Sequence, residues 1–383
     1  MKSLYWRPQR VSLRVMLVVT FVAFCGFAAV ETFRVSERQP YYRLKMAAAR
    51  TALKAFRTVK DARVQRQLPI DPETDPAGSG LIGDLISPIT TNTGHLPAKL
   101  TSVNPNFAAV VVEMLRQARV REGDAVAIGF SGSFPAINIC VLAAVDTLRL
   151  RPLIITSVGA SQWGANHPEL TWLDMEQLLS ESGLLPYRSL AASPGGIDDR
   201  AMGLSKRGRR AITTAVERTG LPLIEPEDYA DSLAKRMALY REQPEEADVR
   251  AYINVGGGST SVGTRVGKQL FKPGLNRSAP PGKMVDSVMA RFAERGVPVI
   301  HVIKIDELAE RYGLPLQPQA MPPVGEGTIY VRQSYSSWLT AAVLAVIVAL
   351  LAALLRFDLG HRVLMAGRRE RDTGQSAAPE PMV

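Results

Sequence analysis

Two long apolar segments, one near each end of the chain, constrain the fold more than any other feature of the sequence. Val15–Val30 and Trp338–Leu355 contain no ionisable side chain. At about 1.5 Å of helical rise per residue, each segment approaches the roughly 30 Å thickness of a bilayer's hydrocarbon core. Only helices and closed barrels satisfy their backbone groups in that environment. We therefore predict transmembrane helices at residues 15–32 and 338–355, which tether the chain between them at both ends.

The basic residues around the second apolar segment predict its orientation. Arg332 is the only basic residue in the twenty positions before this segment, whereas arginine is frequent after it. The arginines that follow are Arg356, Arg362, Arg368, Arg369 and Arg371. Because cytoplasmic flanks are enriched in Lys and Arg, we expect cytoplasmic tails at residues 1–14 and 356–383. The body would then be extracytoplasmic, anchored in the cytoplasmic (inner) membrane. Cleavage of a signal peptide near Gly26-Phe27-Ala28 is the alternative for the first segment.

The net charge of +10 is concentrated towards the N-terminus. Residues 1–66 hold fourteen Lys and Arg against three Asp and Glu, whereas the other 317 residues hold thirty-two against thirty-three. A nearly neutral body argues against a nucleic-acid partner. Residues 36–66 predict a basic juxtamembrane helix, because Pro40 suits a first turn and no glycine follows before Pro69. This helix would be a solvated stalk that packs on the body or on lipid headgroups, or an electrostatic track for an anionic polymer.

Cysteine and histidine are scarce. Cys25 lies in the first apolar segment and Cys140 lies inside an apolar stretch, so we expect no disulfide within the body. The four histidines, His95, His167, His301 and His361, form no cluster with zinc-ligand spacing. We expect neither a metal nor a cofactor.

Helical and strand patterns alternate between residues 67 and 312. Ala125–Phe130, Pro152–Val158 and Ala251–Val255 are short and apolar throughout, as strands are when both faces of a parallel sheet are covered. The segments between them have helical patterns. The sequence thus predicts an α/β body with a mainly parallel sheet and helices on both faces. Residues 313–337 are rich in proline and glycine and predict a semi-rigid linker to the second span.

Three polar segments follow predicted strands, where open α/β sheets bind their ligands. The segments are 131–135, 157–167 and 254–261. Their small and hydroxyl residues suit a carboxylate, although an ordinary capped turn or a structural loop would have a similar composition. The candidate ligand-binding residues are Ser131, Gly132, Ser133, Asn138, Ser161, Asn166, Asn254, Gly256, Gly257, Gly258 and Ser259. The candidate catalytic residues are Ser131, Ser133 and His167.

Two motifs give other interpretations of these segments. Gly129-Phe130-Ser131-Gly132-Ser133 matches the nucleophile elbow G-x-S-x-G except at its fifth position, and would need His301 and an aspartate to form a triad. Asn254–Ser261 is similar to the phosphate loop of actin-like phosphotransferases, but Asn254 stands where that loop has an acidic residue. Both are weaker interpretations than ligand binding.

Several blocks, taken in order, resemble one family. They are Thr93–Lys99, Asn104–Ala109, Ser131–Asn138, Ser157–Ser161, Gly164–Asn166 and Asn254–Gly258. The chain resembles the membrane-anchored poly-γ-glutamate system protein that accompanies bacterial poly-γ-glutamate synthesis. This resemblance covers roughly residues 40–310. It implies an accessory role in making, exporting or anchoring the polymer, with membrane-bound synthase subunits, anionic polyglutamate and the lipid bilayer as partners, and it implies no catalytic residue. The rival hypotheses are a hydrolase or transpeptidase acting on γ-glutamyl bonds, and a scaffold for synthase subunits.

Overall fold

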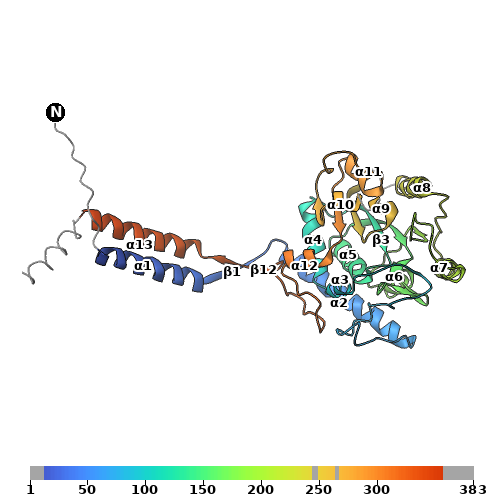
Figure 1. Cartoon of the computed structure of the whole chain (residues 1–383), viewed down its shortest axis with the longest axis horizontal. Helices are drawn as coiled ribbons and strands as arrows, with labels where there is room; N and C mark the ends of the chain where they lie inside the picture. Colours follow the sequence, from blue (N-terminus) through green and yellow to red (C-terminus); the bar gives the residue numbers. More distant parts are fainter. Residues whose placement is uncertain (1–12, 244–248, 264–266, 357–383) are drawn as a thin grey trace, which may run out of the picture. The chain divides into compact units, whose positions relative to one another are not determined.

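The computed structural model describes residues 13–243, 249–263 and 267–356. Its residues form two compact units, one made of the segments before Arg38 and after Val331, the other running from Arg38 to Val331 (Figure 1). The predicted cytoplasmic tails, residues 1–14 and 356–383, fall almost entirely outside the described residues.

The smaller unit contains two apolar helices, α1 (Leu13–Thr32) and α13 (Ser337–Arg356), which lie side by side (Figure 1). Short strands β1 (Arg34–Arg38) and β12 (Val331–Tyr335) pair with each other. The helices approach closely at Gly26, where an added Cβ would collide with the Val343 side chain. Glycine at such a position is typical of closely packed apolar helices.

The two helices are each 20 residues long, but the lengths of their apolar stretches differ. Among the described residues, Ser337–Leu354 is the one helical segment long and apolar enough to cross a membrane. The apolar part of α1, Met16–Thr32, is shorter. A helix of suitable length and composition therefore lies at the predicted second span, whereas the first span and the side of the membrane occupied by the body stay predictions.

The larger unit is built around a six-stranded sheet with the order β10-β11-β9-β3-β4-β8. All neighbours are parallel except β10, which pairs antiparallel with β11. The strands are β3 (Ala125–Ser131), β4 (Arg151–Ser157), β8 (Ala191–Ser193), β9 (Val249–Val255), β10 (Gly274–Asn276) and β11 (Val299–Val302). The chain starts at β3, moves outward through β4 to β8, and then returns to β9 on the other side of β3. This reversal is the topological switch point of a doubly wound fold.

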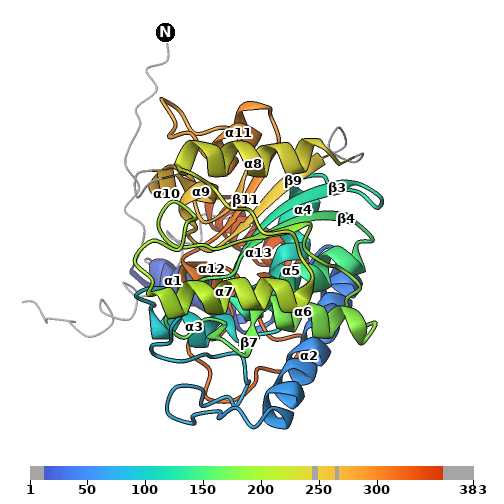
Figure 2. The same cartoon turned by 90° about the vertical axis from the view of Figure 1, so that its right-hand side faces the viewer.

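Alternating side chains of β3 enter two separate cores. Val126, Ile128 and Phe130 pack in a core with helices α2, α4 and α5, whereas Ala125 and Ala127 pack in a core with α8 and α11. Strands with buried side chains on both faces explain the uninterrupted apolar runs of the sequence. The predicted α/β class, the mainly parallel sheet and the helices on both faces are confirmed (Figure 2).

Shorter elements complete the body. The helices are α2 (Tyr42–Gln65), α3 (Leu96–Ser102), α4 (Phe107–Gln117), α5 (Pro135–Thr147), α6 (Trp172–Glu181), α7 (Lys206–Thr219), α8 (Tyr229–Arg241), α9 (Ser259–Val262), α10 (Gly267–Leu270), α11 (Val288–Glu294) and α12 (Ile305–Arg311). Small paired strands are β2 (Thr90–Asn92) with β5 (Ala160–Ser161), and β6 (Asn166–His167) with β7 (Leu170–Thr171).

Helix α2 lies inside the body rather than in a separate juxtamembrane segment at residues 36–66. Its alanine-rich face, with Phe56 and Val59, is buried and packs against α4 and α5. Lys45 is also completely buried, with its Nζ 2.6 Å from Glu113 Oε2. The small alanine side chains allow α2 to pack closely on its neighbouring helices, which makes α2 part of the body. The body therefore begins at Arg38 rather than at residue 67.

The predicted linker at 313–337 is likewise largely part of the body. Buried Asn106 holds it, accepting hydrogen bonds from Gly325 N (3.0 Å) and the Tyr330 hydroxyl (2.7 Å) and donating to Pro323 O (2.9 Å). Leu314 is buried in the core. The prolines therefore shape an ordered surface segment instead of a spacer.

Candidate functional site

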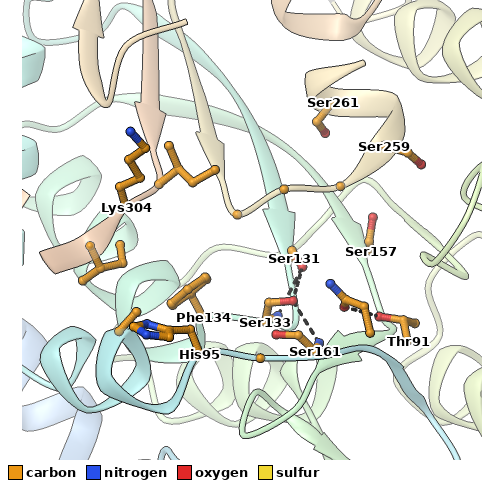
Figure 3. A pocket seen from close by; sticks show the side chains of 18 of the residues that line it. Thr91, His95, Ser131, Ser133, Phe134, Ser157, Ser161, Ser259, Ser261 and Lys304 are labelled. Carbon is orange, nitrogen blue, oxygen red and sulfur yellow. Dashed lines mark hydrogen bonds between the residues drawn. The ribbon is translucent and has the colours of Figure 1, made fainter. Parts of the chain in front are cut away.

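A cavity of about 1120 Å³ lies at the carboxyl ends of the parallel strands, where the loops after β3, β4, β8, β9 and β11 converge. Its lining includes the loops after β3 and β9, the two strands on either side of the switch point. Figure 3 shows serine side chains from several of these loops gathered around it. The serines in its lining are Ser131, Ser133, Ser157, Ser161, Ser259 and Ser261.

The loop after β3 places two hydroxyls side by side. Ser131 Oγ donates to Ser133 Oγ (3.1 Å) and accepts a hydrogen bond from Ser133 N (3.2 Å). Ser133 does not cap α5, because Phe134 is the N-cap residue and no side chain caps this helix. The Ser133 hydroxyl instead accepts a hydrogen bond from Ser161 N (3.1 Å), which joins this loop to the loop after β4 (Figure 3).

The loop after β4 contributes Ser157, Gly159 and Ser161 to the cavity. Ser161 belongs to β5, whose pairing with β2 fixes its position. Asn166 lies outside the cavity lining: its amide is buried and accepts from Asp84 N (2.8 Å) while donating to Thr90 Oγ1 (2.9 Å). It therefore stabilises the fold of the lead-in segment rather than facing a ligand.

The loop after β9 supplies the glycine side of the cavity. Gly256, Gly257, Gly258 and Ser259 line it, and Gly256 has a positive φ of 86° that favours glycine. Asn254 lies below the cavity, buried in the sheet, and its side chain donates to Gly256 O (2.7 Å). Asn254 thus holds the glycine turn in place.

Seven of the eleven candidate ligand-binding residues line the cavity: Ser131, Ser133, Ser161, Gly256, Gly257, Gly258 and Ser259. Gly132 packs against Val158 O, where a Cβ would lie 2.8 Å away. Asn138 is buried and donates to Ser131 O (3.0 Å). Gly132 and Asn138 therefore stabilise the loop after β3 without lining the cavity. The binding roles of the seven residues that line the cavity stay predictions.

The candidate catalytic residues separate in the structure. Ser131 and Ser133 line the cavity, but His167 does not, and its Nδ1 accepts a hydrogen bond from Glu169 N (3.2 Å). His301 is buried in β11 outside the cavity lining, with Nδ1 3.1 Å from Asn254 Nδ2. The structure therefore does not bring either histidine to Ser131 in the cavity.

Lys99 is one of several charged cavity residues that no sequence motif marked as a candidate. It lies on α3, is 2% exposed, and lines the cavity with its Nζ 2.8 Å from Ser161 Oγ. Nζ also donates to Ser133 O and lies 4.1 Å from the centroid of the Phe134 ring. Burial lowers the pKa of Lys99 to about 7, because the ammonium loses its hydration.

A buried ionic network forms another wall of the cavity. Arg236 from α8 lies 2.8 Å from Asp199 Oδ2 and donates to Ser157 Oγ (2.9 Å) and to Ser193 Oγ. Asp199 Oδ1 in turn accepts a hydrogen bond from Ser193 Oγ (2.7 Å). Asp199 raises the pKa of Arg236 against the opposing effect of burial. Each charge is compensated, so the network fixes the loop after β8.

The remaining charged side chains of the cavity come largely from α12 and from the loop around Lys272. Glu307 lies 3.0 Å from Arg311 and 3.5 Å from Lys304, so its carboxylate forms ion pairs with both cations. Figure 3 shows Lys304 and His95 along one side of the cavity. In total the lining contains five Lys and Arg residues and three Asp and Glu residues, which leaves an excess of positive charge.

No group of three or more potential metal-ligating side chains occurs in the part of the chain that the structure describes. The expected absence of a metal or cofactor stays a prediction. The polar side-chain groups that the candidate site presents include hydroxyl, amine and guanidinium groups.

Fold and cavity together define a doubly wound α/β body with a cationic pocket, rich in serine and glycine, at its switch point. Comparisons with protein-family models, curated proteins and solved structures found no match. The central strands β8-β4-β3-β9 follow the order of dinucleotide-binding folds, but β10 and β11 are exchanged relative to those folds and β10 is antiparallel. The first turn, Gly129–Phe134, also lacks the second and third glycines of G-x-G-x-x-G. Function must therefore be argued from the site itself.

Proposed function

We propose that this protein is a membrane-tethered accessory component of a poly-γ-glutamate synthesis and export system, and that its body binds the polymer. The observation that carries this proposal is the cationic excess of a cavity whose lining also contains many hydroxyls and glycines. Ammonium and guanidinium groups bind carboxylates, and hydroxyl and backbone N–H groups add neutral donors. The cavity volume is slightly above the roughly 300–1,000 Å³ of small-ligand sites, so it has room for more than one glutamyl unit.

The proposed setting follows from the apolar helices and from the sequence resemblance. Helices α1 and α13 would cross the cytoplasmic membrane, with both tails inside and the body outside. The growing polymer would reach the body as it leaves membrane-bound synthase subunits. The structure's contribution to this proposal is a helix of suitable length at Ser337–Leu354.

Calorimetry on the full-length chain in detergent micelles tests the binding step. We expect a γ-linked pentaglutamate to bind with an affinity that falls as salt rises, because salt screens exposed charges. Lys272→Ala and Lys304→Ala should each weaken binding about two- to fivefold, the size expected for exposed ion pairs. Lys206→Ala is the matched control, because Lys206 is exposed and does not line the cavity.

Two results would contradict the binding proposal. One is no binding of pentaglutamate, and the other is equal affinity for a neutral oligoglutamine of the same length. In cells, deletion of the gene should abolish or alter surface polyglutamate, and unchanged amount, length and anchoring of the polymer would count against the proposal at the level of the pathway.

A further inference from the structure

Four Lys and Arg side chains are buried among the described residues of the body, and their surroundings differ. Arg63 donates to the backbone carbonyls of Pro69, Gly80 and Ile82, and the charges of Asp84 and Asp75 act on it. Lys45 is paired with Glu113 and donates to Ile329 O (3.1 Å), and Arg236 is paired with Asp199. Lys99 has no carboxylate oxygen within 4 Å of Nζ among the described residues. A lysine that only stabilises a fold is normally paired when it is buried. The unpaired amine of Lys99 instead faces a cavity.

The partner of this amine is a hydroxyl on the same cavity. Lys99 Nζ and Ser161 Oγ are 2.8 Å apart, within the distance over which a base takes a proton from a nucleophile. Ser161 is 6% exposed and its backbone is fixed by strand pairing, so its hydroxyl has little freedom to leave the amine. We propose that Ser161 and Lys99 form a nucleophile–base pair that performs acyl transfer on γ-glutamyl amide bonds.

The protonation state of Lys99 supports this role. Because burial lowers its pKa to about 7, a substantial fraction of the amine is neutral near neutral pH and has a lone pair for the Ser161 proton. The hydrogen bonds of Nζ and the nearby Phe134 ring favour the charged form, whereas the loss of hydration favours the neutral form.

A second hydroxyl is placed to assist. Ser133 Oγ accepts hydrogen bonds from Ser161 N and from Ser131 Oγ, so its own proton remains for a ligand oxygen. Figure 3 shows Ser131, Ser133 and Ser161 grouped together at the cavity. The Ser133 hydroxyl could therefore donate to the negative charge that develops on the carbonyl oxygen under attack.

The reaction is balanced with water as the co-reactant. Ser161 Oγ attacks the γ-carbonyl carbon while its proton passes to Lys99, and the C–N bond then breaks as Lys99 returns that proton to the leaving amine. The resulting ester reacts with water, which gives one proton to Lys99 and its hydroxyl to the acyl carbon. Lys99 then reprotonates Ser161, and the products are a γ-carboxylate and an amine. An amine in place of water would give transpeptidation.

The substrate class rests on the proposed function. Carboxylates flank every amide of a γ-glutamyl chain, and the cations of Lys272, Lys304 and Arg311 line the same cavity as Ser161. These cations could hold neighbouring carboxylates while one amide lies against Ser161. Transfer would then cut or re-anchor the polymer as it passes through the site.

The test uses the full-length chain in detergent micelles with a γ-linked pentaglutamate, and follows new amino groups and product masses. The wild type should cleave, with kcat/KM rising with pH through about 7 as Lys99 loses its proton. Ser161→Ala should lower the rate by roughly 10²–10⁴-fold while keeping its affinity for pentaglutamate. Ser182→Ala, outside the cavity, is the matched control and should keep the full rate.

The outcomes separate this inference from the proposed function. A wild type that binds pentaglutamate without cleaving it overturns the catalytic pair and leaves the binding function standing. A wild type that does not bind overturns the proposed function. Full activity of Lys99→Met overturns the role of Lys99, and if that variant fails to fold, the pH profile and Ser161→Ala decide. A fluorophosphonate adduct that maps to a serine other than Ser161 also overturns the assignment.

Discussion

Glu176 on α6 is completely buried, and both of its carboxyl oxygens accept hydrogen bonds from Ser189, from the backbone N at 2.8 Å and from Oγ at 2.9 Å. These bonds hold the segment that enters β8. Burial raises the pKa of Glu176 to about 7, because the carboxylate loses its hydration, and this exceeds the opposing effects of Ser189 and Arg188. The neutral acid therefore suits this position better than the anion does.

Glu176 makes the stability of the body depend on pH. Its pKa is raised in the folded state, so the folded chain binds more protons than the unfolded chain between pH about 4.5 and 7. The stabilisation is complete below pH 4.5 and is lost as pH rises to 7, a change on the order of 3 kcal/mol. We expect Glu176→Gln to remove this part of the slope in urea unfolding curves measured across that range.

The control is Glu181→Gln on the same helix, where the side chain is exposed. This variant should keep the pH slope of the wild type. An identical slope in Glu176→Gln would show that the carboxyl group does not change its protonation in this range.

Among the helices and strands, the sequence predicted those that depend on a local pattern of residues. Strands β3, β4 and β9 were predicted because each is a continuous apolar run, and each is buried on both faces. At the sheet edge beyond β8, residues 221–224 form a single bridge, between Leu223 and Ala192. Strand β11 ends at Val302, and α12 begins at Ile305.

The parts that were missed depend on contacts between distant segments. Lys99 meets Ser161 across 62 positions of sequence, and no local pattern marks a lysine as buried. Helix α2 carries enough arginine to resemble a solvated stalk, yet its alanine face packs in the core. The segment after Gly313 has the composition of a spacer, but Asn106, more than two hundred positions away, holds it.

Asn106 provides a prediction at this scale. Replacing it with alanine leaves Gly325 N, Pro323 O and the Tyr330 hydroxyl without their partner, and buried unsatisfied groups are costly. We expect Asn106→Ala to lower the free energy of unfolding by roughly 2–4 kcal/mol and to expose residues 313–327 to a broad-specificity protease.

Gln319→Ala is the matched control within the same segment, because Gln319 is exposed. It should change stability by less than about 0.5 kcal/mol and leave the protease pattern unaltered. If both variants are cleaved as slowly as the wild type, the segment is held by its own apolar contacts instead of by Asn106.

For the whole molecule, the function proposed above depends on which side of the membrane the body occupies. Cysteine labelling can determine this side. The chain's own thiols should not react with a water-soluble reagent, because Cys140 is buried and Cys25 lies in the apolar helix α1. An introduced cysteine therefore reports its own position. Thr214 on α7 is exposed, and Ser376 belongs to the predicted cytoplasmic C-terminal tail.

We expect a membrane-impermeant maleimide to label Thr214→Cys in intact cells, and to label Ser376→Cys only after the membrane is permeabilised. The reason is the arginine-rich flank that follows the second apolar segment, which favours a cytoplasmic tail and hence an external body. The unmodified chain is the control and should remain unlabelled in intact cells. Labelling of Ser376→Cys but not of Thr214→Cys in intact cells would place the body inside the cell, where it could not meet an exported polymer. That result would remove the basis for the proposed function even if the pocket binds glutamyl chains in vitro.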